Sequence, residues 1–122
     1  MLANRVLLVE DDADTRELTA LLLHHAGYEV IAAADLAAGI AISRQQPNID
    51  VLMADMYLGR GQTGTSLIRT LRDDGLRMPI VLTSANSEAF AEARELNVTF
   101  LPKPYGRQTL LSVVAMASAG GI

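Results

Sequence analysis

Acidic side chains stand where two apolar runs of this chain end. Glu10, Asp11 and Asp12 directly follow the run VLLV, and Asp55 directly follows VLMA. Carboxylates this close repel one another, and each loses hydration where it is partly buried. Open water or a bound cation must offset that cost. Carboxylate oxygens suit a hard cation, and Mg²⁺ is typically held by one or two carboxylates together with water molecules.

Hydroxyl and ammonium groups follow two later apolar runs. The run PIVL leads to Thr83 and Ser84, and FLP leads to Lys103, which stands between two prolines. A cation site, a hydroxyl and a lysine that converge on a carboxylate would bind an oxyanion, and phosphoryl transfer depends mainly on such positioning and charge neutralisation. A carboxylate can itself be the nucleophile and form an aspartyl phosphate. Asp55 is the candidate nucleophile, because it stands apart from the crowded acidic cluster.

Strands and helices that alternate along the chain must position these groups. Short apolar runs predict buried strands, and apolar residues at helical spacing predict a helix after each strand. The predicted strands cover residues 5–9, 28–33, 49–54, 79–83 and 98–101. The predicted helices cover residues 14–26, a segment from the N-cap Asp35 to a point before Pro47, a segment around 67–71 that Gly75 closes, a short segment capped by Ser87, and a segment around 110–117. Such βα units imply an α/β fold, a doubly wound parallel sheet of five strands with helices on both faces.

The first predicted helix carries its apolar residues along one side. Leu18, Leu21, Leu22 and Ala26 are expected to form its buried face. Gly27 fits the C′ position that follows the helix.

In a doubly wound sheet, ligands bind beyond the carboxyl ends of the strands, where the strand order reverses, and the first and third strands normally flank that point. Here those strands end in the acidic groups at 10–12 and at Asp55. The two groups are therefore expected to meet in one crevice. Thr83, Ser84 and Lys103 should open onto the same edge.

Size and composition narrow the function classes. The chain has 122 residues, 50% of them hydrophobic, which fits one domain with one core. Its formal net charge of −4 argues against a nucleic-acid-binding face, and the absence of cysteine excludes disulfides and thiolate metal sites. No apolar run approaches the ~20 residues of a membrane span, and the first residues lack the apolar segment of a signal peptide. We expect a cytoplasmic domain that binds neither nucleic acid nor membrane.

Four stretches, LLVEDD, VLMAD, PIVLTSA and FLPKP, follow one another in an order known from one protein family. On these stretches the chain resembles, over nearly its whole length, the receiver domains of two-component response regulators. The resemblance implies a single receiver domain over residues 1–122 without an output domain, with a flavodoxin-like (βα)5 fold and strand order 2-1-3-4-5. It also implies a signalling phosphoacceptor rather than an enzyme. Its donor would be a sensor histidine kinase or a phosphotransfer protein, its downstream partner stays open, and it would be a monomer or weak homodimer.

The resemblance implies a role for each candidate in the acidic crevice. Asp11 would bind Mg²⁺ directly and Glu10 through water, while Asp55 would be both the phosphoacceptor and a metal ligand. Tyr57 would offer its backbone carbonyl to the metal. Lys103 would pair with the phosphoryl group.

Other residues resemble the switch of the family. Ser84 stands at the position of the switch hydroxyl, five residues after Pro79, and Thr83 replaces it if the register slips by one. Phe100 stands at the position of the aromatic switch residue. Phosphorylation is then expected to bias the surface formed by the fourth helix, the fifth strand and the last helix. The peptide bond that precedes Pro104 is expected to be cis.

Three features depart from the family pattern. The loop after Asp55 reads MYLGRGQTG, with a glycine where a proline is common and one residue more than usual. The segment 84–103 is short, so the fourth helix is expected to be reduced. Phe100 carries no hydroxyl, so a switch that depends on a tyrosine hydrogen bond is excluded. The first two features resemble receivers attached to hybrid sensor kinases.

Two other functions stay open at this point. A phosphatase could use Asp55 as its nucleophile with Mg²⁺, but such enzymes commonly carry a second acid two residues later, where this chain has Tyr57. A pseudo-receiver would only bind partners. The complete set of Glu10, Asp11, Asp55 and Lys103 speaks against it.

Simpler structural roles stay open for individual residues. Asp12 fits an N-cap of the first helix better than a metal ligand. Arg60, His24 and His25 are expected on the surface, and LGRGQTG lacks the Lys-Ser or Lys-Thr of a phosphate-binding P-loop. The alternative for Ser84 is a plain loop hydroxyl, and the alternative for Lys103 is an exposed lysine. The alternative for Phe100 is an ordinary core side chain.

Overall fold

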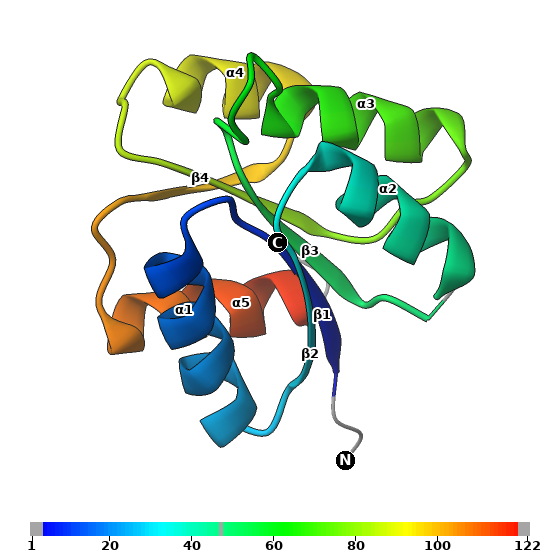
Figure 1. The fold of residues 1–122 in the computed structure, drawn as a ribbon. Coiled ribbons are helices and arrows are strands. Elements are labelled where there is room, and N and C mark those ends of the chain that lie inside the picture. The colour runs from blue at the N-terminus through cyan, green and yellow to red at the C-terminus, as the bar shows by residue number, and fades with distance from the viewer. Residues whose placement is uncertain (1–3, 47, 120–122) are drawn as a thin grey trace.

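Figure 1 shows strands and helices that alternate along residues 4–46 and 48–119, the part of the chain that the computed structural model describes. The strands are β1 (Arg5–Val9), β2 (Glu29–Ala33), β3 (Val51–Asp55), β4 (Ile80–Ser84) and β5 (Thr99–Pro102). The helices are α1 (Ala13–His25), α2 (Leu36–Gln45), α3 (Gly64–Asp73), α4 (Ala89–Leu96) and α5 (Arg107–Ser118). The predicted bounds of the strands and of the first helix differ from these by at most two residues. Pro47, the predicted stop of the second helix, lies outside the described residues, and α2 ends before it.

The strands form one parallel sheet with the order β2-β1-β3-β4-β5, as predicted. The inner strands β1, β3 and β4 are almost completely buried, whereas the edge strands β2 and β5 are partly exposed. Parallel strands that are covered on both faces have continuous apolar sequences. For this reason the runs VLLV, VLMA and PIVL predict the centre of the sheet.

Helices cover both faces of the sheet (Figure 1). Leu7 and Leu52 belong to the core on the side of α2, α3 and α4, while Leu8 and Met53 belong to the core on the side of α1 and α5. Neighbouring residues of a strand point to opposite faces, so each inner strand contributes to both cores. The predicted doubly wound architecture is confirmed. Within the described residues, no helix has the length and apolar character needed to cross a membrane.

The buried face of α1 differs from the predicted one. Leu18 and Leu21 are 58% and 52% exposed and Ala26 is exposed, whereas Leu23 is fully buried and Leu22 is partly buried. The prediction of Leu18, Leu21 and Ala26 as core residues was wrong. Three consecutive leucines spread over more than half of the helix circumference, so their spacing does not select a face. Packing against the sheet selects it.

Replacing Leu23 by alanine is expected to lower the free energy of unfolding by about 2–5 kcal/mol, because the change leaves a cavity in a fully packed core. The same replacement at Leu21 is expected to change it by less than about 0.5 kcal/mol, because that side chain is largely solvated. Urea-induced unfolding followed by circular dichroism compares the two variants. A larger loss in Leu21→Ala than in Leu23→Ala would show that the face predicted from the sequence is the buried one.

Capping carboxylates precede two helices, and glycines follow two helices, as predicted. The carboxylate of Asp12 accepts a hydrogen bond from the amide of Thr15 at 2.9 Å, and Asp35 caps α2 in the same way. Gly27 and Gly75 follow α1 and α3 with φ angles of 100° and 89°, a region that glycine adopts without steric cost.

The start of α4 contradicts one prediction. Ser87 does not cap this helix: its N-cap position is Glu88, which makes no side-chain capping bond. Instead, the side-chain oxygen of Asn86 accepts a hydrogen bond from the amide of Glu88 at 2.9 Å. Asn and Ser side chains compete for the same backbone donors, and here the residue one position earlier makes the bond. With 8 residues, α4 is short, as the short segment 84–103 predicts.

Candidate functional site

The carboxyl ends of β1 and β3 bring two acidic side chains together. Val9 pairs with Ala54 in the parallel register, so Glu10 and Asp55, which follow them, are neighbours. Alternation along the strands directs both side chains toward the face that α1 and α5 cover. The acidic groups at the ends of the first and third strands therefore meet at this edge, as predicted.

Lys103 joins these two carboxylates. Its Nζ donates hydrogen bonds to Oε1 of Glu10 at 2.7 Å and to Oδ2 of Asp55 at 2.9 Å. Its backbone amide is held by the carbonyl of Ser84 at 2.9 Å, and its peptide bond to Pro104 is cis, as predicted. Lys103 is the single lysine of the sequence.

Asp11 completes an acidic cluster. Carboxylate oxygens of Glu10, Asp11 and Asp55 all lie within 4.8 Å of one another. Glu10 and Asp55 are buried, with 2% and 8% exposure, whereas Asp11 is exposed. Lys103 supplies one positive charge to three carboxylates, so the donor set fits a hard divalent cation with an open, solvated side.

Burial governs the ionisation of this cluster. It raises the pKa of Glu10 to about 7, although the hydrogen bond from Lys103 opposes the change, and the charge of Asp55 raises the pKa further. Burial alone would lower the pKa of Lys103, but its bonds to Glu10 and Asp55 outweigh that effect and the pKa rises. The ammonium therefore stays charged at neutral pH. A cation that binds here would favour the ionised form of Glu10.

The stability of the metal-free protein is expected to fall as the pH rises from about 4.5 to about 7. In this range the native state binds more protons than the unfolded state, because the pKa of Glu10 is raised in the folded protein, and the free energy of unfolding then decreases with pH. The expected loss is on the order of 1–3 kcal/mol. Urea unfolding in the presence of a chelator, repeated across this pH range, measures it. The variant Glu10→Gln should flatten the profile, and an unchanged slope in that variant would contradict the assignment to Glu10.

A shallow pocket of about 250 Å³ opens above the buried carboxylates. Ser84 lines this pocket, whereas Thr83 is buried in the adjoining strand and does not line it. The hydroxyl of Ser84 accepts a hydrogen bond from the amide of Asn86 at 3.0 Å. The structure thus brings together most of the residues that the sequence singles out, with Ser84 as the hydroxyl at the pocket. The lining residues are Asp11, Asp55, Tyr57, Ser84, Ala85, Asn86 and Lys103.

The backbone of Tyr57 is turned toward the same site. Its amide donates a long hydrogen bond of 3.4 Å to Oδ1 of Asp55. Tyr57 forms an isolated antiparallel bridge with Thr63, in which the hydrogen bonds are made by the flanking residues. In that pattern both backbone groups of the central residue point away from its partner. The carbonyl of Tyr57 is therefore directed to the side on which Asp55 lies.

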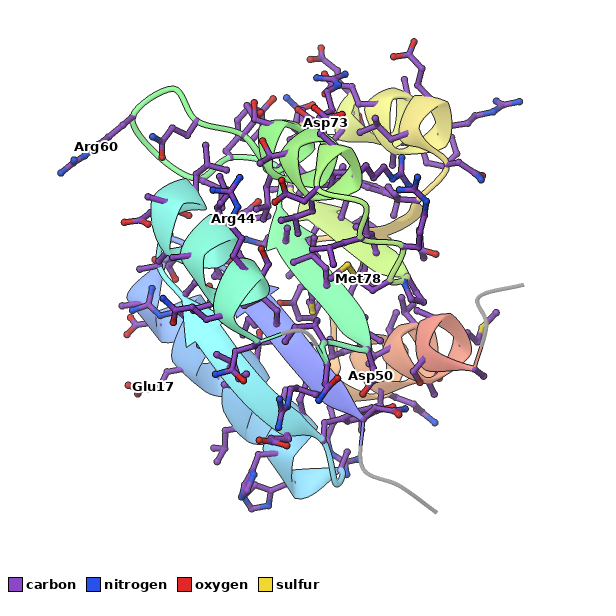
Figure 2. All side chains as sticks on the ribbon, turned by 90° about the vertical axis from the view of Figure 1, so that its right-hand side faces the viewer. Glu17, Arg44, Asp50, Arg60, Asp73 and Met78 are labelled. Atoms are coloured by element: carbon purple, nitrogen blue, oxygen red, sulfur yellow. The ribbon has the colours of Figure 1, made fainter. Side chains whose placement is uncertain are left out.

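Phe100, Arg60 and the two histidines, all considered in the sequence analysis, lie away from the pocket. Phe100 is partly buried and packs edge-on against Phe90 of α4, with ring centroids 5.9 Å apart and an interplanar angle of 71°. Arg60 is exposed at the tip of the β3–α3 loop, and Figure 2 shows its side chain directed away from the ribbon. His24 and His25 are exposed at the end of α1, as predicted.

Other contacts of the site have no signal in the sequence. Nη1 of Arg16 donates a hydrogen bond to the backbone carbonyl of Glu10 at 2.9 Å. The hydroxyls of Thr19 and Tyr105 are hydrogen-bonded at 2.8 Å although 86 positions separate them. Tertiary structure alone creates these pairs.

The sequence and the fold of this chain match one protein family. A model of the response regulator receiver domain matches residues 6–115. The chain is 33% identical over 117 residues to the CAI-1 autoinducer sensor kinase/phosphatase CqsS of Vibrio cholerae, a match that covers 91% of this chain and 17% of CqsS. The chain spans about half the length of other curated relatives that it matches.

Solved structures agree with that match. The receiver domain of the hybrid histidine kinase CckA is similar with a TM-score of 0.80 and 33% identity, over 94% of this chain and 99% of that one. The chemotaxis protein CheY4 of Vibrio cholerae is similar with a TM-score of 0.85 and 26% identity, over 95% and 99% of the two chains. The likeness extends over nearly the whole of each chain.

Proposed function

This chain belongs to the response regulator receiver domain family, and we propose that Asp55 is the residue on which it accepts a phosphoryl group. As a receiver domain of a two-component phosphorelay, it is a phosphoacceptor rather than a classical enzyme, and its phosphodonor is a histidine kinase. A phosphotransfer protein is the alternative phosphodonor that we propose.

The contact between Lys103 and the two buried carboxylates carries this proposal. An ammonium 2.9 Å from Asp55 is placed to neutralise the oxygens of a phosphoryl group that forms there. Asp55 is the carboxylate that combines burial with direct access to the pocket, since Glu10 is buried but does not line it and Asp11 is exposed. Transfer would form a bond between a carboxylate oxygen of Asp55 and phosphorus, while the bond from phosphorus to the donor imidazole breaks. The electron pair of that bond returns to the imidazole, which then takes up a proton.

Mg²⁺ is the cation we propose for the acidic cluster. Asp11 and Asp55 would hold it directly, Glu10 through water, and Tyr57 through its backbone carbonyl. The support is the set of carboxylate oxygens within 4.8 Å of one another and the orientation of the Tyr57 backbone. When bound, the ion supplies charge neutralisation for the phosphoryl oxygens. Asp55 remains the nucleophile.

Ser84 and Lys103 are proposed as the groups that respond to phosphorylation. Both line the pocket, and the carbonyl of Ser84 accepts a hydrogen bond from the amide of Lys103, so a shift at the end of β4 would be passed to the end of β5. A pull on these ends would bias the surface of α4, β5 and α5. Phe100 has no hydroxyl, so its ring contact with Phe90 would carry the change to α4.

The kind of protein that contains this receiver, and its location, are also proposals. We infer that residues 1–122 form one receiver unit of the kind found in hybrid kinases, because CqsS is described as a sensor kinase/phosphatase and CckA as a hybrid histidine kinase. A cytoplasmic location rests on the family alone. The downstream partner stays open.

Intact-mass measurement of the wild-type chain with a small acyl phosphate tests the proposed function. We expect a gain of one phosphoryl group in the presence of Mg²⁺ and no gain in the presence of a chelator. Equal gain under both conditions would contradict the metal role. No gain from either the small donor or a phosphorylated histidine kinase would favour a partner-binding pseudo-receiver, and continuous phosphate release from a phosphomonoester would favour a phosphatase.

A further inference from the structure

A pair of hydroxyl groups connects α1 to the segment between β5 and α5. Oη of Tyr105 and Oγ1 of Thr19 are 2.8 Å apart. Thr19 is only 2% exposed, and Tyr105 packs against the apolar core of Leu23 and Leu110 on the same side of the sheet. A buried hydroxyl needs a hydrogen-bond partner, and these two side chains provide one for each other.

This pair anchors the segment that carries Lys103. On one side of the segment, the amide of Lys103 is fixed to the carbonyl of Ser84 at 2.9 Å. Pro104 has no amide hydrogen and cannot add a second backbone anchor as a donor. The hydroxyl of Tyr105, two residues after Lys103, supplies the anchor on the other side before α5 begins at Arg107.

The same segment borders open space. A groove of about 400 Å³ separates it from α1 and is lined by Leu18 and Leu22 on one side and by Lys103, Pro104 and Tyr105 on the other. Beyond the Tyr105 ring, close packing therefore does not hold the segment against α1. The bond between Tyr105 and Thr19 crosses this groove and adds a directional constraint to the packing of the ring.

We propose that Tyr105, held by Thr19, is a positioning residue that keeps Nζ of Lys103 between Glu10 and Asp55 and so sets the rate of phosphoryl acceptance. The proposal rests on the proposed function of Asp55. Lysine has a flexible side chain of four methylene groups, so the position of its backbone decides where its ammonium rests. A catalytic group that is misplaced by about 1 Å loses much of its effect.

The hydroxyl of Tyr105, rather than its ring, performs this role. The ring packs against the apolar core, and a phenylalanine would fill the same space. Burial raises the pKa of Tyr105, so the phenol stays protonated and the contact with Thr19 is a bond between neutral hydroxyls at physiological pH. Tyr105→Phe and Thr19→Val each remove one hydroxyl and keep the shape of the side chain.

Because Lys103 is the single lysine of the sequence, its ammonium can be observed without assignment. We would label the lysine side-chain nitrogen isotopically and record the NMR signal of the ammonium group in the metal-free protein. Tyr105→Phe is expected to shift this signal and to speed the exchange of its protons with water, because the hydrogen bonds to Glu10 and Asp55 lengthen. Tyr28→Phe is the matched control: Tyr28 is a partly buried phenol packed against the same core, and it is expected to leave the signal unchanged.

The rate of phosphorylation by a small acyl phosphate provides the second measurement. Tyr105→Phe and Thr19→Val are each expected to slow it about three- to tenfold, the effect of about one hydrogen bond. The double variant should be no slower than the slower single variant. In a Lys103→Ala background, Tyr105→Phe should cause no further loss, because the residue acts through Lys103.

The outcomes separate this inference from the proposed function. An unchanged lysine signal in Tyr105→Phe overturns the inference, and so does a loss of rate that persists in the Lys103→Ala background. If the wild-type chain gains no phosphoryl group, the proposed function fails, and the lysine signal still decides whether Tyr105 positions Lys103.

Discussion

Replacing Asp55 by asparagine is expected to abolish phosphoryl incorporation. The amide has nearly the shape of the carboxylate and keeps an oxygen that can accept the hydrogen bond from Lys103, but it is not a nucleophile toward phosphorus. Intact mass after incubation with an acyl phosphate and Mg²⁺ should show one added phosphoryl group on the wild type and none on the variant. Asp73→Asn is the control, since Asp73 is exposed at the end of α3 (Figure 2) and should retain the full gain.

The same variant has an expected effect on stability. The charge of Asp55 contributes to the raised pKa of Glu10, so its removal relieves repulsion in the metal-free cluster. Asp55→Asn should therefore unfold at an equal or higher urea concentration than the wild type at neutral pH, which excludes misfolding as the reason for lost phosphorylation. Retention of the mass gain would place the acceptor elsewhere. Peptide mapping and Asp11→Asn would then decide between the remaining carboxylates.

Replacing Lys103 by methionine is expected to slow phosphorylation on the order of a hundredfold. The change keeps an unbranched side chain but removes the ammonium that lies 2.7 Å from Glu10 and 2.9 Å from Asp55. Removal of one preorganised group that stabilises developing charge typically costs 10²- to 10³-fold in rate. The rate of mass gain at saturating Mg²⁺ measures the effect. Arg107→Met, which removes an exposed cation at the start of α5, should leave the rate unchanged.

Two results would contradict that role of Lys103. An undiminished rate in Lys103→Met would make the lysine a structural counter-charge only, and equal losses in Lys103→Met and Arg107→Met would indicate a dependence on net charge rather than on position. A structural counter-charge has its own signature. Without Lys103, the buried carboxylates lack their positive partner, and the loss of stability should grow with pH as Glu10 ionises.

Local features of the sequence determine which segments form strands and helices and where these begin and end. Buried parallel strands need continuous apolar runs, and helices need caps and C′ glycines at their ends, so VLLV and VLMA, the caps Asp12 and Asp35, and Gly27 are all visible without a structure. Periodicity fails where several registers fit. Three adjacent leucines in α1 and adjacent polar residues before α4 each allow more than one arrangement, and the predictions for Leu21 and Ser87 were wrong for that reason.

The sequence by itself determines which chemical groups stand at the ends of the strands. A parallel sheet brings those ends to one edge, so the meeting of Glu10, Asp55 and Lys103 follows from strand order and alternation. The tertiary structure alone decides how strongly these groups are buried, and hence that the pKa of Glu10 rises to about 7. It also decides that Tyr105 meets Thr19, because no local pattern links residues 86 positions apart. Burial and long-range contact depend on the packing of the whole chain, whereas runs, caps and strand ends depend only on neighbouring residues.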